Sequence, residues 1–281
     1  MNLEQPNIKL KKDRIRLVVL KKLETLVSQG DNILIGASGG CDSTALVYIL
    51  YSLKKRFSLS LSLCHFNHCL RKESGKDAEF VKDIAERLNL PLYVERWKNP
   101  IHSQRMARRA RYDFFLKVAK EINAKSIALG HNLDDNIETI LFHIIRGETP
   151  YGIEEKREMD EIRIIRPLID IERKEIEKYL AKNNIPFIID KTNTEPVYTR
   201  NKIRLKLIPL LYEFNPRFKY GLLKLSSIWK RNLDFLEEEA EKIISKESHP
   251  ALLAHILRKK GLSFSKIEKT IKMIKDGKVK I

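Results

Sequence analysis

The sequence is poor in cysteine, because its 281 residues include only Cys41, Cys64 and Cys69. Three cysteines cannot close a disulfide framework, and their spacing matches no common zinc or iron–sulfur pattern, so a reducing interior is the simplest context. No apolar run is long enough to cross a bilayer. Residues 1–12 are polar and lack the apolar core of a secretory signal. These absences predict a cytoplasmic protein with no membrane partner.

Acidic residues are scarce relative to basic ones. The chain has 37 Asp and Glu against 54 Lys and Arg, which gives a formal net charge of +17. This excess favours an anionic polymer such as nucleic acid as the partner, although a lysine-rich proteome or heat adaptation would give a similar composition. The length suits one large domain and a smaller one.

Strand-like and helix-like patterns alternate over the first half of the chain. The predicted strands lie at residues 33–35, 59–65, 92–94 and 126–129. The predicted helices lie at residues 14–28, 42–53, 74–89, 103–122 and 133–146. Alternation of this kind predicts an α/β fold in which a parallel sheet carries helices on both faces. A charged loop (about 148–162), a helix (171–183) and a short strand (187–189) are expected to follow.

Residues 38–43 (SGGCDS) lie between the first predicted strand and its helix. The glycines let backbone N–H groups approach phosphate oxygens, and the helix N-terminus adds partial positive charge. The hydroxyls of Ser38 and Ser43 can donate to the same oxygens. Asp42 would repel phosphate directly, so its expected role is to hold a Mg²⁺ ion that bridges to the phosphates. Two glycines alone would indicate only a turn, but the whole pattern predicts a phosphate site.

The loop is not a Walker motif, because no Gly-Lys-Ser/Thr follows it. It resembles the PP-loop of the ATP pyrophosphatase group, whose fold is adenine nucleotide alpha hydrolase-like. Members of that group cleave ATP between the α and β phosphates, adenylate a substrate oxygen and let a nucleophile displace AMP. The resemblance implies ATP as the cofactor.

Two polar stretches follow the ends of predicted strands, at residues 65–71 (HFNHCLR) and 130–139 (GHNLDDNIET). Loops at the carboxyl ends of parallel strands converge on a ligand. Asp134 and Glu138 lie four residues apart on one helix face, where they could bind magnesium or a cationic amine. Helix capping is the alternative for each carboxylate taken alone, and packing at a strand end is the alternative for His65.

A third block, residues 200–204 (RNKIR), makes the resemblance more specific. Together with residues 166–168 (RPL) and 190–193 (DKTN), it is similar to the tRNA(Ile)-lysidine synthetase family, over about residues 30–217. The PP-loop is shared by many enzymes, whereas the Arg-Asn-x-Ile-Arg block is much more characteristic of this family.

The family resemblance implies a reaction. ATP adenylates the oxygen at C2 of the wobble cytidine in the CAU anticodon of an isoleucine tRNA, and free L-lysine then attacks C2 and releases AMP, which leaves lysidine. The attacking amine must be neutral, so a carboxylate or histidine is expected to take its proton. The cytidine is expected to be extruded from the RNA into a pocket.

The expected site residues fall into four groups. The expected ATP-binding residues are Ser38, Gly39, Gly40, Asp42, Ser43 and Arg108. The expected catalytic residues, with no division of roles among the last four, are Asp42, His131, Asp134, Asp135 and Glu138. The residues expected to contact lysine or cytidine are His65, Asn67, His68, Arg71, Asp134 and Glu138. The residues expected to bind tRNA are Arg111, Arg200, Asn201 and Arg204.

The predicted helix at 103–122 is strongly basic. Its residues 107–112 (ARRARY) are similar to the family's Ala-Arg-x-x-Arg-Tyr, and Arg108 and Arg111 lie near one face, where they could hold phosphates or the adenylate. Gln104 departs from the pattern, since the family usually has a glutamate there, and this puts a proton or metal role at that position in doubt. For Arg105 and Arg109, a basic face exposed to water is the preferred interpretation.

Two later regions are also basic: residues 200–219 carry six Lys or Arg, and residues 258–281 carry nine. Such clusters suit contacts to phosphates, with an exposed charged helix as the alternative for the second. Because proline disfavours helix in the residue before it, we place a boundary at Asn215-Pro216. The prediction is a PP-loop ATP-binding catalytic domain at 1–215 and a small helical tRNA-binding domain at 216–281. A homodimer is compatible with the sequence, which does not set the oligomeric state.

Three other functions were weighed. A tRNA thiolation enzyme of the same group would add sulfur at C2 of cytidine, but the cluster-dependent members need a Cys-x-x-Cys pair, which this sequence lacks. A catalytically silent RNA-binding protein would be expected to have lost some of the loop and acidic residues. An amide-forming synthetase for a small metabolite is disfavoured by the two basic clusters.

Overall fold

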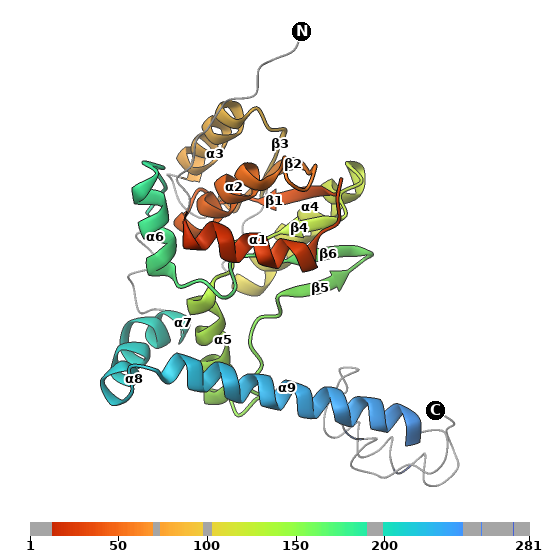
Figure 1. Cartoon of the computed structure of the whole chain (residues 1–281), viewed down its shortest axis with the longest axis vertical. Helices are drawn as coiled ribbons and strands as arrows, with labels where there is room; N and C mark the ends of the chain where they lie inside the picture. Colours follow the sequence, from red (N-terminus) through yellow and green to blue (C-terminus); the bar gives the residue numbers. More distant parts are fainter. Residues whose placement is uncertain are drawn as a thin grey trace. The chain divides into compact units, whose positions relative to one another are not determined.

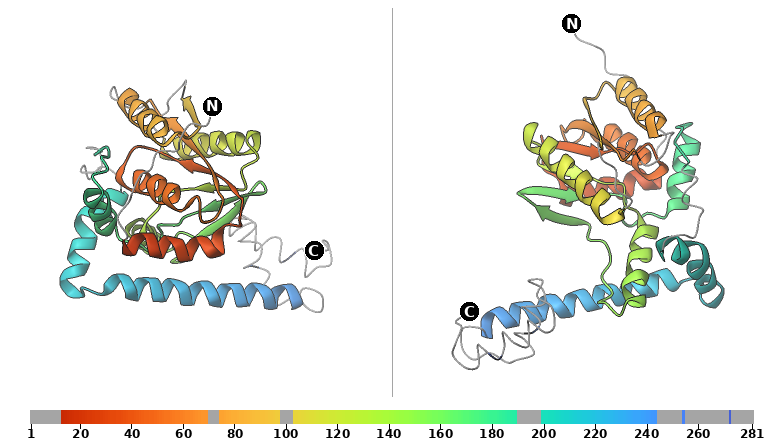
Figure 2. Two further views of the ribbon diagram at one scale, coloured as in Figure 1. Left: turned by 45° about the horizontal axis from the view of Figure 1, so that its top comes forward. Right: turned by 180° about the vertical axis from the view of Figure 1, so that it is seen from behind.

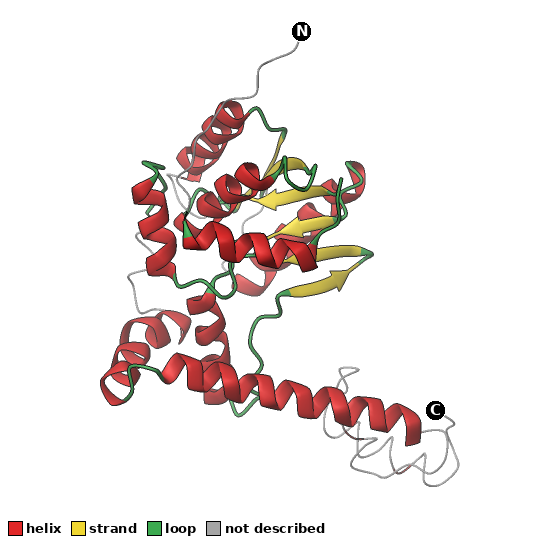
Figure 3. Ribbon diagram, in the orientation of Figure 1, coloured by secondary structure: helices red, strands yellow, loops and turns green. Residues whose placement is uncertain are grey.

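The computed structural model describes residues 13–69, 74–97, 103–189 and 199–243, together with the single residues 254 and 272. Arg71 and residues 190–193 therefore lie outside the described residues. The described part of the chain folds around one six-stranded sheet, with helices that follow most of its strands (Figures 1 and 3). No described helix is both long enough and apolar enough to cross a membrane.

The sheet has the strand order β3-β2-β1-β4-β6-β5. The strands are β1 (Asn32–Gly36), β2 (Ser60–Asn67), β3 (Leu92–Arg96), β4 (Ser126–Ala128), β5 (Lys156–Met159) and β6 (Ile162–Ile165). Every neighbouring pair is parallel except β5 with β6. The parallel sheet expected from the alternating pattern is thus confirmed. Its order reverses between β1 and β4, and ligands of open α/β sheets bind outside the carboxyl ends of the strands at such a point.

Two strand predictions were wrong. Strand β5 lies inside the segment expected to be a charged loop. The sequence did not indicate it, because three of its four side chains are exposed and an edge strand of this kind carries no apolar alternation. Its backbone pairs with β6 from Lys156 opposite Ile165 to Met159 opposite Ile162. The expected strand at 187–189 is only a single bridge, in which the N–H of Ile188 donates to the carbonyl oxygen of Gly39 at 2.9 Å.

The helices lie close to their predicted positions, within two residues at every end. They are α1 (Arg14–Leu26), α2 (Cys41–Leu53), α3 (Ser74–Leu88), α4 (Gln104–Glu121), α5 (Leu133–Ile145) and α6 (Arg173–Lys182). The remaining described helices are α7 (Thr199–Lys202), the π-helical turn η2 (Ile203–Leu207), α8 (Ile208–Phe214) and α9 (Phe218–Ile243). The last two are separated at Asn215-Pro216, where a helix break was expected.

Side chains of successive strand residues enter two different cores. Ile33 and Ile35 pack with α1, α2, α3 and α6 on one face of the sheet, whereas Leu34 between them packs with α4 on the other. Figure 2 shows α1 and α2 on one side of the sheet and α4 on the other. This alternation follows from the two-residue period of a strand. Because both faces are covered, β1, β2 and β4 are buried along most of their length, as is usual in parallel sheets.

The chain divides into two compact units. The first comprises Met1–Phe142 with Gly152–Leu211, and the second comprises His143–Tyr151 with Tyr212–Ile281. The six strands belong to the first unit. In the second, the rings of Tyr212 and Phe218 meet edge to face at 4.9 Å between centroids. The assignment of a catalytic domain to 1–215 and an RNA-binding domain to 216–281 stays a prediction.

We expect Ile127→Ala to lower the free energy of unfolding by about 2–5 kcal/mol, because Ile127 is fully buried between the sheet and α4 and its truncation leaves a cavity. Leu17→Ala is the matched control, since the Leu17 side chain is 60% exposed, and it should change the free energy by less than about 1 kcal/mol. Urea unfolding followed by circular dichroism measures both. Equal losses in the two variants would contradict this account of the core.

Candidate active site

The glycine loop between β1 and α2 is held by its own hydroxyl groups. The hydroxyl oxygens of Ser38 and Ser43 lie 2.9 Å apart, and Ser43 Oγ also accepts from the N–H of Ser38 at 3.1 Å. Gly39 has φ +82°, a conformation that favours glycine. Gly40 is the N-cap of α2 and has no side chain to cap it. The first N–H groups of α2 therefore have no side-chain cap, which is the arrangement that binds an anion at a helix N-terminus.

The loop after β4 is in direct contact with the start of α2. A methyl group placed on Gly130 would lie 3.0 Å from the backbone carbonyl carbon of Asp42 and the backbone nitrogen of Ser43, so any side chain here would push the two backbones apart by a few tenths of an ångström. Two residues later, Asn132 Nδ2 donates to Asp42 Oδ1 at 2.9 Å. The two loops on either side of the point where strand order reverses are thus joined by a side-chain hydrogen bond.

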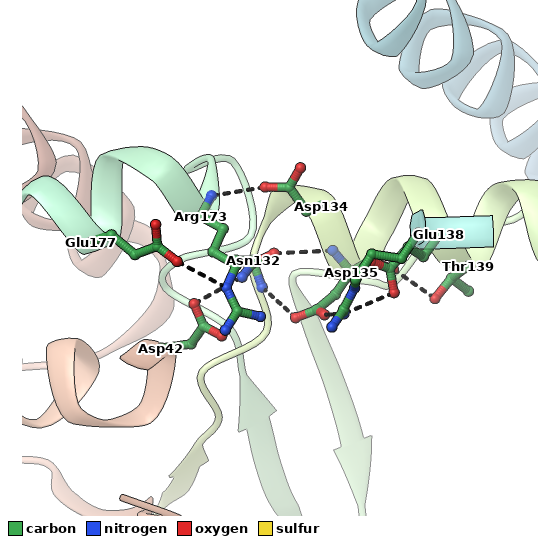
Figure 4. Close-up of polar contacts among 9 residues, drawn as sticks. Asp42, Asn132, Asp134, Asp135, Glu138, Thr139, Arg173 and Glu177 are labelled. Atoms are coloured by element: carbon green, nitrogen blue, oxygen red, sulfur yellow. Dashed lines mark hydrogen bonds and ion pairs between the residues drawn. The ribbon is translucent and has the colours of Figure 1, made fainter. Parts of the chain in front are cut away.

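Asn132 and Asp135 cap the N-terminus of α5 reciprocally (Figure 4). Asn132 Oδ1 accepts from the N–H of Asp135 at 3.0 Å, and Asp135 Oδ2 accepts from the N–H of Asn132 at 3.1 Å. This is the geometry of a capping box. Asp135, expected as a catalytic residue, therefore has a structural role in the fold, as the capping alternative anticipated. Asn132 was not among the expected site residues, although its position three residues before an aspartate is the sequence signature of such a cap.

Asp134 connects α5 to α6. Its Oδ2 accepts from the backbone N–H of Arg173 at 2.7 Å, at the first residue of α6 (Figure 4). The Arg173 side chain pairs with Glu177 at 3.3 Å and lies close enough to Asp42 to favour the ionised form of that carboxylate. No pattern in the sequence indicated Arg173, because it comes from a helix far along the chain from the acidic cluster.

Glu138 forms a buried ion pair with Arg204. Arg204 Nε lies 2.6 Å from Glu138 Oε1, and its Nη2 lies 3.0 Å from Oε2, which is a two-point contact. The same Nη2 is 3.6 Å from Asp135 Oδ1. The Glu138 side chain is only 5% exposed and that of Arg204 is 29% exposed. Asp134 and Glu138, expected to share one ligand, are thus held by different partners, whereas Glu138 and Asp135 share Arg204.

Burial and like charge act together on Asp42. Burial and, to a smaller extent, the nearby Asp135 carboxylate together raise the pKa of the Asp42 carboxyl to about 6, against the effects of Arg173, Asn132 and Arg204. Burial also raises the pKa of Asp135. Within the described residues, no group of three or more His, Cys, Asp or Glu could hold a metal ion by itself.

The three histidines near the sheet edge are neutral at pH 7. The Nδ1 of His65 lies 2.8 Å from the Ala37 carbonyl oxygen, which only accepts, so Nδ1 carries the proton and the buried Nε2 is left without a partner as an acceptor. Burial, reinforced by four arginines that include Arg166 and Arg111, lowers the pKa of His131 to about 3. Burial also lowers the pKa of His65, and lowers that of His68 to about 4.

The remaining expected residues lie as follows. Asn67 is buried at the end of β2, where its Oδ1 accepts from the N–H of Cys69 at 2.9 Å. On α4, the guanidinium carbons of Arg108 and Arg111 lie 5.2 and 5.6 Å from the centre of the Tyr112 ring. On α7, Arg200 lies 5.7 Å from the Phe142 ring, next in sequence to Asn201. Arg108, Arg111 and Arg200 each lower the pKa of His131 through their positive charge.

The glycine loop at the reversal of strand order, with Asp42 beside it, is the site of a PP-loop fold. The model of the PP-loop domain matches residues 13–211, and the chain therefore belongs to this family. Among curated proteins it is similar to tRNA(Ile)-lysidine synthases. One from Thermosipho africanus is 35% identical, with 86% of this chain and 61% of that protein covered. One from Clostridioides difficile is 39% identical, with 77% and 49% covered, and one from Thermotoga maritima is 34% identical, with 79% and 55% covered.

The chain thus spans about half to three fifths of the length of these relatives. Among solved structures, the U34-tRNA thiolase NcsA from Methanococcus maripaludis has a similar fold, with a TM-score of 0.66, 16% sequence identity and 78% of each chain covered. This likeness supports the α/β sheet of the first unit with its flanking helices.

We expect Arg204→Ala to lower the free energy of unfolding by about 3–5 kcal/mol, because it leaves the buried Glu138 carboxylate without its partner. The double variant Glu138→Leu/Arg204→Met replaces the ion pair by apolar groups and should cost much less. Urea unfolding at neutral pH compares the two. If the double variant were as unstable as Arg204→Ala, the loss of stability would not come from the unpaired charge of Glu138.

Asp42 should make stability depend on pH. Its pKa is raised from 3.8 to about 6 on folding, so between these values the folded protein binds more protons than the unfolded chain, and stability falls as pH rises through this interval. Asp42→Asn keeps an oxygen for Asn132 but removes the titration. The variant should therefore become more stable relative to wild type as pH rises from below 3.8 to above 6. Urea unfolding on both sides of the interval tests this, and a constant difference would contradict it.

Proposed function

We propose that this protein is a tRNA(Ile)-lysidine synthase, which joins free lysine to C2 of the wobble cytidine of an isoleucine tRNA with a CAU anticodon. ATP is converted to AMP and pyrophosphate through an adenylated cytidine. The observation that carries the proposal is the junction between the PP-loop and the acidic start of α5, where Asp42 and Asp135 are both hydrogen-bonded to Asn132. The named relatives, at 34–39% identity, support the same reaction.

The PP-loop supplies the phosphate end of the site. Uncapped N–H groups at the start of α2, together with the Ser38 and Ser43 hydroxyls, would bind the pyrophosphate part of ATP. Asp42 fits a Mg²⁺ ion, because this ion is usually bound by one or two carboxylates completed by substrate phosphates and water rather than by a cage of protein ligands. When bound, the ion would neutralise charge that develops on the leaving pyrophosphate. Burial is the main cause of the raised pKa of Asp42, and Arg173 and Arg204 offset it only in part.

The acidic cluster would bind the amine. Asp134 and Asp135 each use a carboxylate oxygen for a backbone N–H, and a carboxylate can accept further hydrogen bonds from a lysine ammonium. As the N–C2 bond forms and the bond from C2 to the adenylate oxygen breaks, the amine must lose a proton. Asp135, a carboxylate whose pKa is raised by burial and which has no metal role, is a better acceptor than His131, whose pKa of about 3 makes it a weak base.

The neutral histidines would contact the cytidine. In the neutral state, His65 presents an unprotonated Nε2, and the buried Nδ1 atoms of His68 and His131 have no hydrogen-bond partner in the protein. Buried polar atoms without partners are uncommon in folded proteins. Hydrogen bonds to an extruded base would satisfy them. We assign the three histidines to base recognition and the carboxylates to the amine.

The test of the proposal supplies ATP, Mg²⁺, radiolabelled lysine and an isoleucine tRNA transcript with a CAU anticodon. We expect label in the RNA in proportion to the AMP formed. Asp42→Ala should reduce incorporation by about 100-fold or more, the scale seen when one group that stabilises developing charge is removed. Arg87→Gln, an exposed change on α3, is the matched control and should keep wild-type activity.

A transcript with a GAU anticodon should remain unlabelled, because it has no cytidine at the wobble position. Pyrophosphate release that depends on the CAU transcript without labelled RNA would show that another nucleophile is used. Normal turnover by Asp42→Ala would contradict the role given to that carboxylate.

A further inference from the structure

A cavity of about 340 Å³ lies between α4 and the β5–β6 hairpin in the first unit. Its lining includes five arginines and one carboxylate, that of Asp113. The arginines are Arg105, Arg108, Arg109, Arg157 and Arg166. Lysine outnumbers arginine in the whole chain, yet every basic residue of this lining is arginine. Arginine differs from lysine in its planar fork, which matches two phosphate oxygens at once and stacks on flat rings.

The inner part of the cavity carries buried hydrogen-bond donors that the protein leaves unused. Arg166 is 5% exposed, and one of its terminal nitrogens donates to the Glu154 carbonyl oxygen at 2.5 Å, but its Nε has no partner. Tyr112 is 9% exposed, and its hydroxyl group lies beside the Arg166 guanidinium without the geometry of a hydrogen bond. Buried donors of this kind cost folding free energy unless a ligand accepts from them.

The outer part of the cavity is formed by exposed arginines. Three of them share one face of α4 with Tyr112, because they follow a three- and four-residue spacing: Arg105, Arg108 and Arg109. The fourth, Arg157, lies on β5. Like charges at this spacing repel one another in a helix. The contact of Arg109 with Asp113 is long, at 3.8 Å, and both side chains are largely exposed, so it compensates little of this charge.

We propose that this cavity binds a nucleotide of the RNA substrate next to the one that is modified, with its phosphate held by the arginines and its base or ribose against Tyr112. Arg166, which lines the cavity, directly follows β6 and therefore lies at the carboxyl edge of the sheet, where the PP-loop also lies. A volume of about 340 Å³ lies within the range of small-ligand pockets. The proposal rests on the proposed function for the identity of the RNA. It replaces the interpretation of Arg105 and Arg109 as a face that only meets water.

The first test uses the double variant Arg105→Gln/Arg157→Gln, which removes two exposed charges that have no assigned role in the ATP site. Affinity for a fluorescent stem–loop RNA with a CAU loop is measured by anisotropy over a series of KCl concentrations. Two lost phosphate contacts should reduce the slope of log K against log salt by about 1.4, at roughly 0.7 per contact to single-stranded RNA. The KM for ATP should not change.

The matched control is Arg87→Gln/Lys178→Gln, which removes the same charge from exposed positions on α3 and α6, on the opposite face of the sheet. This control should leave the slope close to that of wild type. Equal slopes for both double variants would mean that net charge alone matters and would overturn the proposal.

Tyr112→Phe tests the inner part of the cavity. The contact of the Tyr112 hydroxyl group with Arg166 lacks hydrogen-bond geometry, so its removal should change the unfolding midpoint little, whereas RNA affinity should fall roughly two- to tenfold. A lower midpoint with unchanged RNA affinity would assign the hydroxyl group to folding and overturn its role in binding.

Two further arms separate the outcomes. Competition of inorganic phosphate and pyrophosphate against RNA binding shows whether the cavity takes a free anion. If Arg105→Gln/Arg157→Gln binds RNA as tightly as wild type but its RNA binding is less inhibited by phosphate, the RNA assignment is overturned. Lysine incorporation by the wild-type protein reports on the proposed function separately. Absent incorporation with a reduced salt slope in the variant would remove the proposed reaction but keep an RNA site in this cavity.

Discussion

The hydrogen bond from Asn132 Nδ2 to Asp42 Oδ1 connects the two halves of the sheet at their carboxyl edge. It forms only because Gly130 lets the loop after β4 approach the backbone at the start of α2, where a side chain would meet Asp42 and Ser43. The other contacts of Asn132 orient it for this bond, since the reciprocal cap with Asp135 fixes its side chain and backbone together. The side-chain amide of Asn132 therefore holds the anion-binding end of α2 next to the acidic end of α5. The proposed reaction needs both helix ends, one for ATP and one for the amine.

Compensation of buried charge explains why residues far along the chain complete the site. The carboxylates come from α2 and α5, whereas the arginines beside them, Arg173 and Arg204, come from α6 and η2. Carboxylates this close raise one another's pKa values, and the nearby arginines offset part of that effect. The acidic site thus depends on the folding of residues beyond the sheet. This gives a physical reason for the Arg-Asn-x-Ile-Arg block, whose last arginine makes the two-point contact with Glu138.

The parts that the sequence could predict are those governed by local periodicity and backbone chemistry. The first four strands (β1 to β4), their helices and the glycine loop follow from the alternation of strand-like and helix-like segments and from the position of Ser-Gly-Gly between strand and helix. Strand β5 could not be predicted, because Lys156, Arg157 and Glu158 are exposed and pairing with β6 alone makes them a strand. Partners could not be predicted either: the acidic block was recognised as a site, but its contacts with Arg173 and Arg204 depend on tertiary packing. Similarly, Arg105 and Arg109 look like a solvated face until the hairpin is placed opposite them.

The charges around the carboxyl edge of the sheet are separated by type. On the side of α2, α5 and α6, the carboxylates lie beside Arg173 and Arg204. A cationic ligand would therefore bind carboxylate oxygens of groups that already accept hydrogen bonds from the protein. On the side of α4 and β6, Arg111 and Arg166 have buried Nε atoms with no acceptor, and burial lowers the pKa of both guanidinium groups. The same arginines lower the pKa of His131, which keeps this imidazole neutral. An amine and an anionic RNA would therefore be drawn to opposite sides of one site. The neutral histidine is the polar group suited to a neutral base, because a charged imidazole among these arginines would be repelled by them.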